Sequence, residues 1–300
     1  MSARMSDFNE DDIAKAGTQR RRGRFLRLNS LWLLLPALGF LAVFFAYPLA
    51  SVVMRSFDGG DAGLTVEHYA TFFSVPVYPR ILWQTIEISL ITTGLCVVVG
   101  YPLAYVMANS SAAVRNVMLL MVMLPFMTSV LVRTYGWMVI LRPTGLLNHL
   151  AEMFGLPPFE LLYNRPGMLI GLVYTMVPYV VLTLYSVMRG IDGRLVAVAS
   201  SLGASAWSSF WRIYFPLSLP GVAGASLLVF ILSSGFYITP RLMGGDRDQL
   251  LASIISYQVD VLLNFEFASA IAVILLIITL VCFGIYARLV GLKQLLTSRS

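Results

Sequence analysis

The chain has 300 residues, of which 58% are hydrophobic and 12% are charged. Soluble domains carry about 25% charged residues, so this composition excludes an ordinary water-soluble globular domain and indicates a protein that lies mostly in lipid. The formal net charge is +6. Because basic residues collect on the cytoplasmic side of membrane proteins, topology explains this excess better than nucleic-acid binding does.

The N-terminal segment, residues 1–29, is polar and basic and contains few apolar residues. Such a segment cannot bury enough apolar surface to fold, so we expect a disordered tail. Its basic residues are expected to hold the following helix against the anionic lipid of the inner leaflet. The apolar run that begins at Leu31 is longer than the core of a signal peptide, so we expect an anchor that is retained.

Six apolar segments are long enough to cross a bilayer, whose core of about 30 Å requires about 20 helical residues. Backbone polar groups in lipid must be satisfied within their own segment, so each is expected to be helical. The sequence therefore predicts an all-α membrane protein with one domain, residues 30–300, that contains six transmembrane helices. These helices are predicted at residues 31–53, 83–107, 117–141, 168–188, 222–240 and 267–289.

The basic residues are divided unequally between the two sides of the predicted membrane domain. An even number of spans puts both termini on one side, and that side receives most of the lysines and arginines. The bias of basic residues toward the cytoplasm then places both termini there. The loop between the fourth and fifth spans, about residues 190–221, is expected on the same side.

This loop has the pattern of two short helices joined at a glycine. Asp192 is placed to cap the first helix and Ser205 to cap the second, with Gly203 between them as the break. Pro216 and the Pro220-Gly221 pair are expected to separate the second helix from the fifth span.

Apolar residues recur in the loop at spacings of three and four, which is typical of one apolar helix face. Leu195, Ala199 and Leu202 form one such series. One interpretation is a pair of helices that lie on the membrane surface, and another is a projection that docks in a groove of a soluble partner. Small residues at the break favour docking. The expected tip consists of Ala197, Ala199, Ser200, Ser201, Leu202, Gly203, Ala204 and Ser205.

The same residues resemble a known signature. Ala199-Ser200-Ser201-Leu202-Gly203-Ala204, followed by Phe210, Ile213, Pro216 and Pro220-Gly221, looks like the cytoplasmic signature loop of ABC importer permease subunits. That pattern begins Glu-Ala-Ala, and in this register the glutamate position is occupied by Ala197. The docking shape is therefore implied by the resemblance, whereas a salt bridge from this position is not.

Further motifs are similar to the spermidine/putrescine branch of that family, and the similarity covers the chain from about residue 30 to its end. They are Leu124-Pro125-Phe126, Arg133-Thr134-Tyr135-Gly136-Trp137, Leu141-Arg142-Pro143-Thr144-Gly145-Leu146-Leu147-Asn148, Tyr237-Ile238-Thr239-Pro240 and Leu242-Met243-Gly244-Gly245.

The resemblance implies a type I ABC importer permease-like bundle in a bacterial inner membrane. Its implied partners are two copies of an ATPase subunit, a second and related permease subunit, and a periplasmic solute-binding protein. ATP and Mg would be used by the ATPase, and the chain carries no phosphate-binding G-x-x-x-x-G-K-[ST] loop. The signature loop would receive the motion of the ATPases and pass it to the membrane helices.

Two charged residues lie inside predicted spans, Glu87 and Arg133. A charge at such depth costs about 2.5–3.5 kcal/mol on insertion scales, so each is expected to face protein or water. They either line the solute path or form a Glu87–Arg133 ion pair that joins two helices. For Arg133 the pair is favoured, because its charge would repel a cationic solute.

Aromatic rings in or near the spans provide a second way to bind a cation, although such rings also anchor helices at membrane interfaces. The candidate residues of the solute path are Glu87, Arg133, Tyr135, Trp137, Tyr237 and Asp260.

The favoured function is a transport subunit that is not itself an enzyme, with a polyamine such as spermidine or putrescine as its solute. Opines, aminophosphonates, an ion-coupled carrier and a structural scaffold remain as alternatives. No Ser-His-Asp or HExxH grouping is present, and the two histidines, His68 and His149, are isolated in loops, so no catalytic or metal site is expected.

Overall fold

The computed structural model describes residues 36–60 and 63–297, with side chains up to Arg288. The tail predicted for residues 1–29 lies outside this part of the chain. Contacts divide the chain into two units, Met1–Arg55 and Ser56–Ser300, and each is described by itself.

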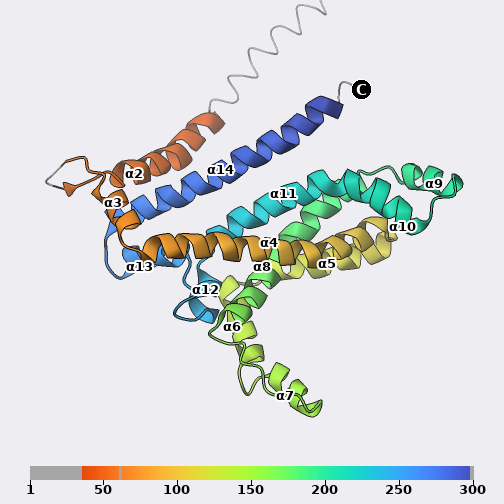
Figure 1. Ribbon diagram of the computed structural model, residues 1–300, viewed down its shortest axis with the longest axis horizontal. Helices are drawn as coiled ribbons and strands as arrows, with labels where there is room; N and C mark the ends of the chain where they lie inside the picture. The colour runs from red at the N-terminus through yellow and green to blue at the C-terminus, as the bar shows by residue number, and fades with distance from the viewer. Residues whose placement is uncertain (1–35, 61–62, 298–300) are drawn as a thin grey trace, which may run out of the picture. The chain divides into compact units, whose positions relative to one another are not determined.

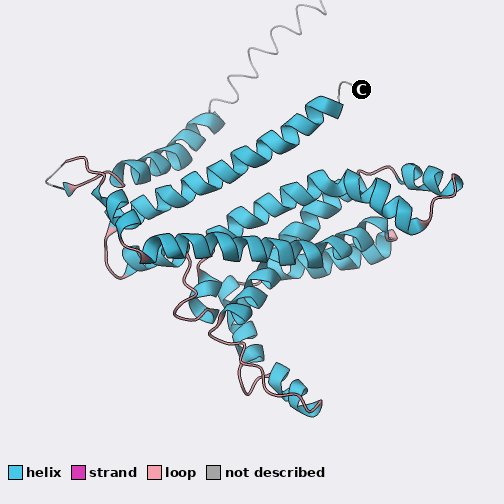
Figure 2. Ribbon diagram, in the orientation of Figure 1, coloured by secondary structure: helices cyan, strands magenta, loops and turns pink. Residues whose placement is uncertain are grey.

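Helices account for most of the described residues, as Figure 2 shows, and the strand-like pairing within them is an isolated bridge between Asp58 and Leu64. Within the described part of the chain, five helices are long and apolar enough to cross a membrane, and the number reaches six if one bent pair is counted as a single span. The predicted all-α membrane fold is therefore confirmed.

The first unit is helical from Pro36 to Arg55. It contains a π-helical turn, η1 (Ala42–Ala46), which is followed by α2 (Tyr47–Arg55). This turn ends two residues before Pro48, whose missing backbone donor disturbs regular helical bonding. The helix agrees with the predicted span 31–53 from Pro36 onward.

Three long helices form the centre of the second unit. They are α4 (Val77–Asn109), α8 (Arg165–Arg189) and α11 (Phe215–Ser234), and each packs against the other two. Figure 1 shows α9 (Gly193–Ser201) and α10 (Ala206–Ser209) near one end of α4 and α13 (Leu251–Asp260) near the other. We call these the α9 end and the α13 end.

Small residues let these helices approach closely. A Cβ atom built on Gly100 would lie 2.8 Å from Val180 Cγ1, and one built on Gly221 would lie 2.9 Å from Val187 Cβ. Ser234 Oγ in α11 donates a hydrogen bond of 3.1 Å to Ser89 Oγ in α4. Gly221 and Ser234 of α11 therefore serve close helix packing.

The third predicted span, residues 117–141, is wrong as a single straight helix. The chain forms α5 (Ala112–Met127) and α6 (Val130–Leu141), and the helical stretches on either side of the break are bent by 100°. Thr128 closes a turn at the break, because its backbone N–H and its hydroxyl both donate to the carbonyl of Pro125. The break consists of two polar residues, Thr128 and Ser129, and the apolar residues on both sides keep the hydropathy of the whole segment high, so hydropathy alone did not reveal it.

The fifth predicted span, residues 222–240, is also misplaced. The chain is helical without a stop from Ala206 to Ser234, and the short helix α12 (Ile238–Met243) follows. Pro216 lies in the first turn of α11, directly after the π-helical turn η3 (Phe210–Tyr214). Proline is tolerated in a first helical turn, so it does not separate the loop from the span as predicted.

The last span, α14 (Phe265–Thr297), packs on α13 and on α3 (Glu67–Ser74). A second apolar cluster joins these helices around Phe72, Leu251 and Ile271. The segment between α6 and α8 contains α7 (Leu146–Met153). Asn148 fixes α7 by donating to the carbonyls of Arg142 and Phe159, at 3.1 and 2.9 Å.

The close approach at Gly100 predicts a specific loss of stability. Gly100→Val is expected to destabilise the protein by about 1–3 kcal/mol, because the new side chain overlaps Val180 in a packed core. Gly94→Val in the same helix is the matched control, since a Cβ atom there meets no atom within 4 Å. Thermal unfolding of the two purified variants in one detergent measures the difference, and equal midpoints would contradict the packing role of Gly100.

Candidate functional site

The loop between α8 and α11 folds as predicted from its caps. Asp192 Oδ1 accepts a hydrogen bond of 2.9 Å from the backbone N–H of Arg194, at the start of α9. Ser205 Oγ accepts one of 3.2 Å from the N–H of Ser208, at the start of α10. Both predicted capping residues and both predicted helix starts are therefore confirmed.

Gly203 ends α9 in the left-handed conformation, with φ of +85°. The N–H of Gly203 donates to the carbonyl of Ser200, and the N–H of Ala204 donates to that of Ala199, each at 3.0 Å. This is the Schellman arrangement, which favours glycine because an L side chain is strained at positive φ. A Cβ atom on Gly203 would meet nothing within 4 Å, so the glycine is required by backbone conformation and not by lack of space.

The outer surface of α9 carries an apolar stripe. Leu195, Val198 and Leu202 are 47%, 58% and 83% exposed, whereas Ala199 is only 9% exposed. The predicted series of Leu195, Ala199 and Leu202 is therefore wrong as one face, because Ala199 faces the rest of the chain. Spacings of three and four also connect Leu195 to Val198 and Leu202, so the sequence contained this alternative.

Aromatic packing fixes the loop to the end of α4. The ring of Phe210 lies edge-on to Tyr105 at 5.4 Å, and Tyr214 lies edge-on to Tyr105 at 5.0 Å. Asn109 Nδ2 donates to the Tyr214 hydroxyl at 3.4 Å, and the Tyr101 hydroxyl bonds Ser218 Oγ at 2.9 Å. The loop is therefore held on the bundle by its second helix while α9 projects from it.

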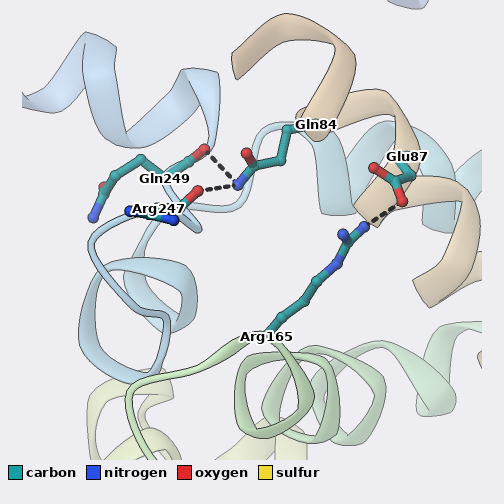
Figure 3. A network of polar contacts seen from close by, with 5 residues as sticks. All are labelled: Gln84, Glu87, Arg165, Arg247 and Gln249. Carbon is teal, nitrogen blue, oxygen red and sulfur yellow. Dashed lines mark hydrogen bonds and ion pairs between the residues drawn. The ribbon is translucent and has the colours of Figure 1, made fainter. Parts of the chain in front are cut away.

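Glu87 pairs with a residue that the sequence did not suggest. Arg165 Nη2, at the start of α8, lies 2.6 Å from Glu87 Oε1 in α4, as Figure 3 shows. The predicted Glu87–Arg133 pair is therefore wrong. Arg165 was counted as a loop residue, but α8 begins at this residue, with Pro166 in its first turn and Asn164 as its cap.

Neighbouring hydrogen bonds join the same end of α4 to the segment before α13. Gln84 Nε2 donates to the carbonyls of Arg247 and Gln249, at 2.8 and 3.4 Å (Figure 3). Thr85 Oγ1 accepts a bond of 3.0 Å from the N–H of Leu251. Together with the ion pair, these bonds connect α4 to both α8 and the start of α13.

Arg133 has no polar side-chain partner in the described chain. Its Nε atom is buried and makes no hydrogen bond, and no acidic group of the described residues lies within ion-pair distance. The next residue, Thr134, is buried, and its hydroxyl lies 3.2 Å from that of Thr239 in α12. This contact fixes the start of α6, and with it the position of Arg133.

The remaining path candidates are distributed over several elements. Tyr135 in α6 and Tyr237 before α12 are exposed. Asp260 accepts a bond of 2.6 Å from Ser256 Oγ, which in turn accepts one of 3.1 Å from Arg241 Nη1. Trp137 lies edge-on to Tyr174 at 5.4 Å. The described structure does not bring the six candidates together at one point.

An apolar cavity of about 670 Å³ lies between α4, α5, α6 and α8. No sequence pattern indicated this cavity, because its walls come from four segments whose residues are ordinary for membrane spans. The lining residues are Leu95, Val99, Met121, Val122, Pro125, Trp137, Pro166, Leu169, Ile170, Val173, Tyr174, Val177 and Pro178.

Residues 100–292 match the family of binding-protein-dependent transport system inner membrane components. The chain belongs to this family. The matched region contains the loop, its glycine and every described helix from the end of α4 to α14.

Individual relatives agree with this assignment. The spermidine/putrescine transport system permease protein PotB of Haemophilus influenzae is 33% identical over 227 residues, which cover 75% of this chain and 79% of that protein. PotB of Escherichia coli is 31% identical over 258 residues, which cover 83% and 94%. The molybdenum transport system permease protein ModB of Mycobacterium bovis is 24% identical over 259 residues, which cover 86% and 94%.

Solved structures show the same fold. A chain of a bacterial alginate ABC transporter, in complex with an alginate-bound periplasmic protein, matches with a TM-score of 0.70 and 18% identity over 90% of this chain and 95% of that chain. A chain of the MetNI methionine ABC transporter, in an inward-facing conformation, matches with a TM-score of 0.55 and 15% identity over 72% and 96%. The fold is therefore that of an ABC importer permease.

A double-mutant cycle tests the new partner of Glu87. The side chains of Arg165 and Glu87 are 36% and 43% exposed, and a pair that accessible to solvent is expected to contribute no more than about 1 kcal/mol. Glu87→Gln and Arg165→Gln should therefore show a small favourable coupling in unfolding free energy. The matched cycle of Glu87→Gln with Arg133→Gln should show no coupling. Coupling in the Arg133 cycle and none in the Arg165 cycle would instead support the Glu87–Arg133 pair expected from the sequence.

Proposed function

We propose that this chain is one of two permease subunits of an ATP-driven importer, and that the loop carrying α9 receives the ATPase subunits. The observation that carries the proposal is the projecting helix α9, which ends at Gly203 in a membrane protein of the binding-protein-dependent family. A helix that presents an exposed apolar stripe to water is unfavourable by itself, which supports a protein partner that covers it.

The docking surface consists of the expected tip together with the apolar stripe. Leu195, Val198 and Leu202 supply the apolar contact. The hydroxyls of Ser200 and Ser201 donate to carbonyls of their own helix, at 3.0 and 3.1 Å, so the tip presents few unsatisfied donors. The tip residues that can contribute are Ala197, Ser200, Ser201, Leu202, Gly203, Ala204 and Ser205, whereas Ala199 is buried against the rest of the chain.

The proposal also assigns the two ends of the helix bundle to the two sides of the membrane. The α9 end of the bundle faces the cytoplasm together with both termini, residues 1–29 form a basic tail there, and residues 30–300 form the permease domain. The distribution of basic residues supports this orientation. The α13 end then faces the periplasm, where a solute-binding protein delivers its cargo.

We further propose a polyamine as the solute, on the basis of the PotB relatives. Glu87, Tyr135, Tyr237 and Asp260 are the proposed contributors of this chain to the path, because carboxylates and aromatic rings attract protonated amines. A second permease subunit, related to this chain, completes the path. ATP and Mg belong to the two ATPase subunits, and a bound nucleotide is not part of the proposal for this chain.

A molybdenum oxyanion is the second candidate solute, because ModB is a more distant relative and the unpartnered cation of Arg133 suits an anion. The identities of 33% and 31% to PotB against 24% to ModB favour the polyamine.

The apolar stripe predicts a docking defect. Leu202→Asp is expected to reduce co-purification of the ATPase subunits and solute uptake by at least tenfold, because about 1.4 kcal/mol of lost docking energy is a factor of ten. Ala197→Glu is the matched control: it also adds one negative charge to α9, but at the position where the family pattern carries glutamate. Normal uptake by Leu202→Asp, with Ala197→Glu also normal, would remove the stripe from the docking surface.

The solute is tested on the complete transporter, reconstituted in lipid vesicles with its binding protein. Spermidine or putrescine is expected to stimulate ATP hydrolysis and to accumulate inside, whereas molybdate is not. Stimulation by molybdate alone would replace the polyamine with the oxyanion. Uptake driven by an ion gradient in vesicles that contain this chain without ATPase would reject the importer itself.

A further inference from the structure

Arg133, which has no partner among the described residues, lies next to the cavity between α4, α5, α6 and α8. Trp137 lines the cavity, and Arg133 lies four residues before it in α6, on the same helix face. The cavity also extends to Pro166, in the first turn of α8. Arg133 is therefore placed one helical turn beyond the lining, toward the break that separates α6 from α5.

The cavity and Arg133 together are complementary to an amphiphilic ligand with an anionic head group. The lining residues are apolar except for the indole of Trp137 and the hydroxyl of Tyr174. The guanidinium of Arg133 has five donors and uses none of them on the described residues. A ligand whose hydrocarbon part fills the cavity and whose anionic oxygen reaches Arg133 would match both the apolar lining and the guanidinium.

A polyamine does not fit this description. The cavity offers no carboxylate among its lining residues, and burial of an unpaired ammonium group in an apolar site is strongly unfavourable. The charge of Arg133 near one end adds like-charge repulsion. This apolar cavity is therefore a poor site for the cationic solute.

A helix of a neighbouring subunit fits poorly for reasons of size. A helix with its side chains is about 10–12 Å wide, so a volume of about 670 Å³ holds less than two turns of it. An acyl chain is much narrower and bends to follow an irregular wall. Each methylene that it buries adds to the favourable transfer of the chain from water.

We propose that this cavity binds one acyl chain of an anionic phospholipid, whose phosphate accepts hydrogen bonds from Arg133. Arginine matches phosphate oxygens with paired donors, and Trp137 and Tyr174 have the amphipathic character of residues at the level of lipid headgroups. Basic sites between membrane helices are a known mode of lipid recognition. The proposal does not depend on which solute the transporter carries.

The test measures lipid retention on the intact transporter complex. The complex is placed in nanodiscs that contain equal amounts of phosphatidylglycerol and phosphatidylcholine, and the lipids that remain bound after detergent extraction are counted by native mass spectrometry. The unaltered complex is expected to retain phosphatidylglycerol preferentially. Arg133→Gln is expected to reduce this preference about fivefold, the fold-change that corresponds to about 1 kcal/mol for one basic residue near a lipid surface.

Two further variants separate the cavity from the charge. Ile170→Trp fills the cavity from its wall and is expected to abolish retention of either lipid, whereas Ile277→Trp, on an exposed position of α14, should leave retention unchanged. Arg142→Gln removes an exposed charge at the end of the same helix, α6, and should also leave it unchanged. Intact assembly of the subunits shows that each variant has folded.

Four results would overturn the proposal. The first is unchanged lipid preference in Arg133→Gln, and the second is unchanged retention in Ile170→Trp. The third is a photo-crosslinking residue at position 137 that attaches to the second permease subunit and not to lipid, which would assign the cavity to the subunit interface. Displacement of the retained lipid by saturating spermidine would likewise reject it, in favour of a solute site.

Discussion

The close approach of α4, α8 and α11 is the constraint on which the rest of the molecule depends. Glycine at positions 100 and 221 lets valine side chains of α8 sit directly on the neighbouring backbones, and in lipid such van der Waals contact replaces the hydrophobic effect as the force between helices. These three helices place the loop with α9 at one end of the bundle, and the Glu87–Arg165 pair joins two of them toward the other end. A change in their packing would displace both ends together.

The sequence was informative wherever a local rule decides the structure. Hydropathy located the long apolar segments, because lipid requires a helix of a given length. Asp192, Gly203 and Ser205 were recognised as cap, break and cap, because each acts on backbone groups within a few residues of itself. The projecting helix and its end were therefore predictable without knowledge of the rest of the chain.

Prediction failed where distant segments decide the structure. The partner of Glu87 depends on where α8 begins in space, and nothing near residue 87 carries that information. The bend between α5 and α6 falls at Thr128-Ser129, but two polar residues between long apolar stretches did not lower the hydropathy of the segment enough to divide it. Ala199 was assigned to the outer face although it is buried, because the same spacing also fits Leu195, Val198 and Leu202. The cavity beside Trp137 likewise exists only when four helices have come together.

Both π-helical turns in the described chain end two residues before a proline, η1 before Pro48 and η3 before Pro216. At η3 the extra residue in the turn lets helical bonding continue past the proline, so α10, η3 and α11 form one uninterrupted rod from Ala206 to Ser234. Within this rod, no break in the helix separates α10, where the loop meets the bundle, from the membrane span behind it. Displacement that reaches α10 would therefore tilt or shift that span as a stiff body, instead of being absorbed by a hinge at the membrane surface.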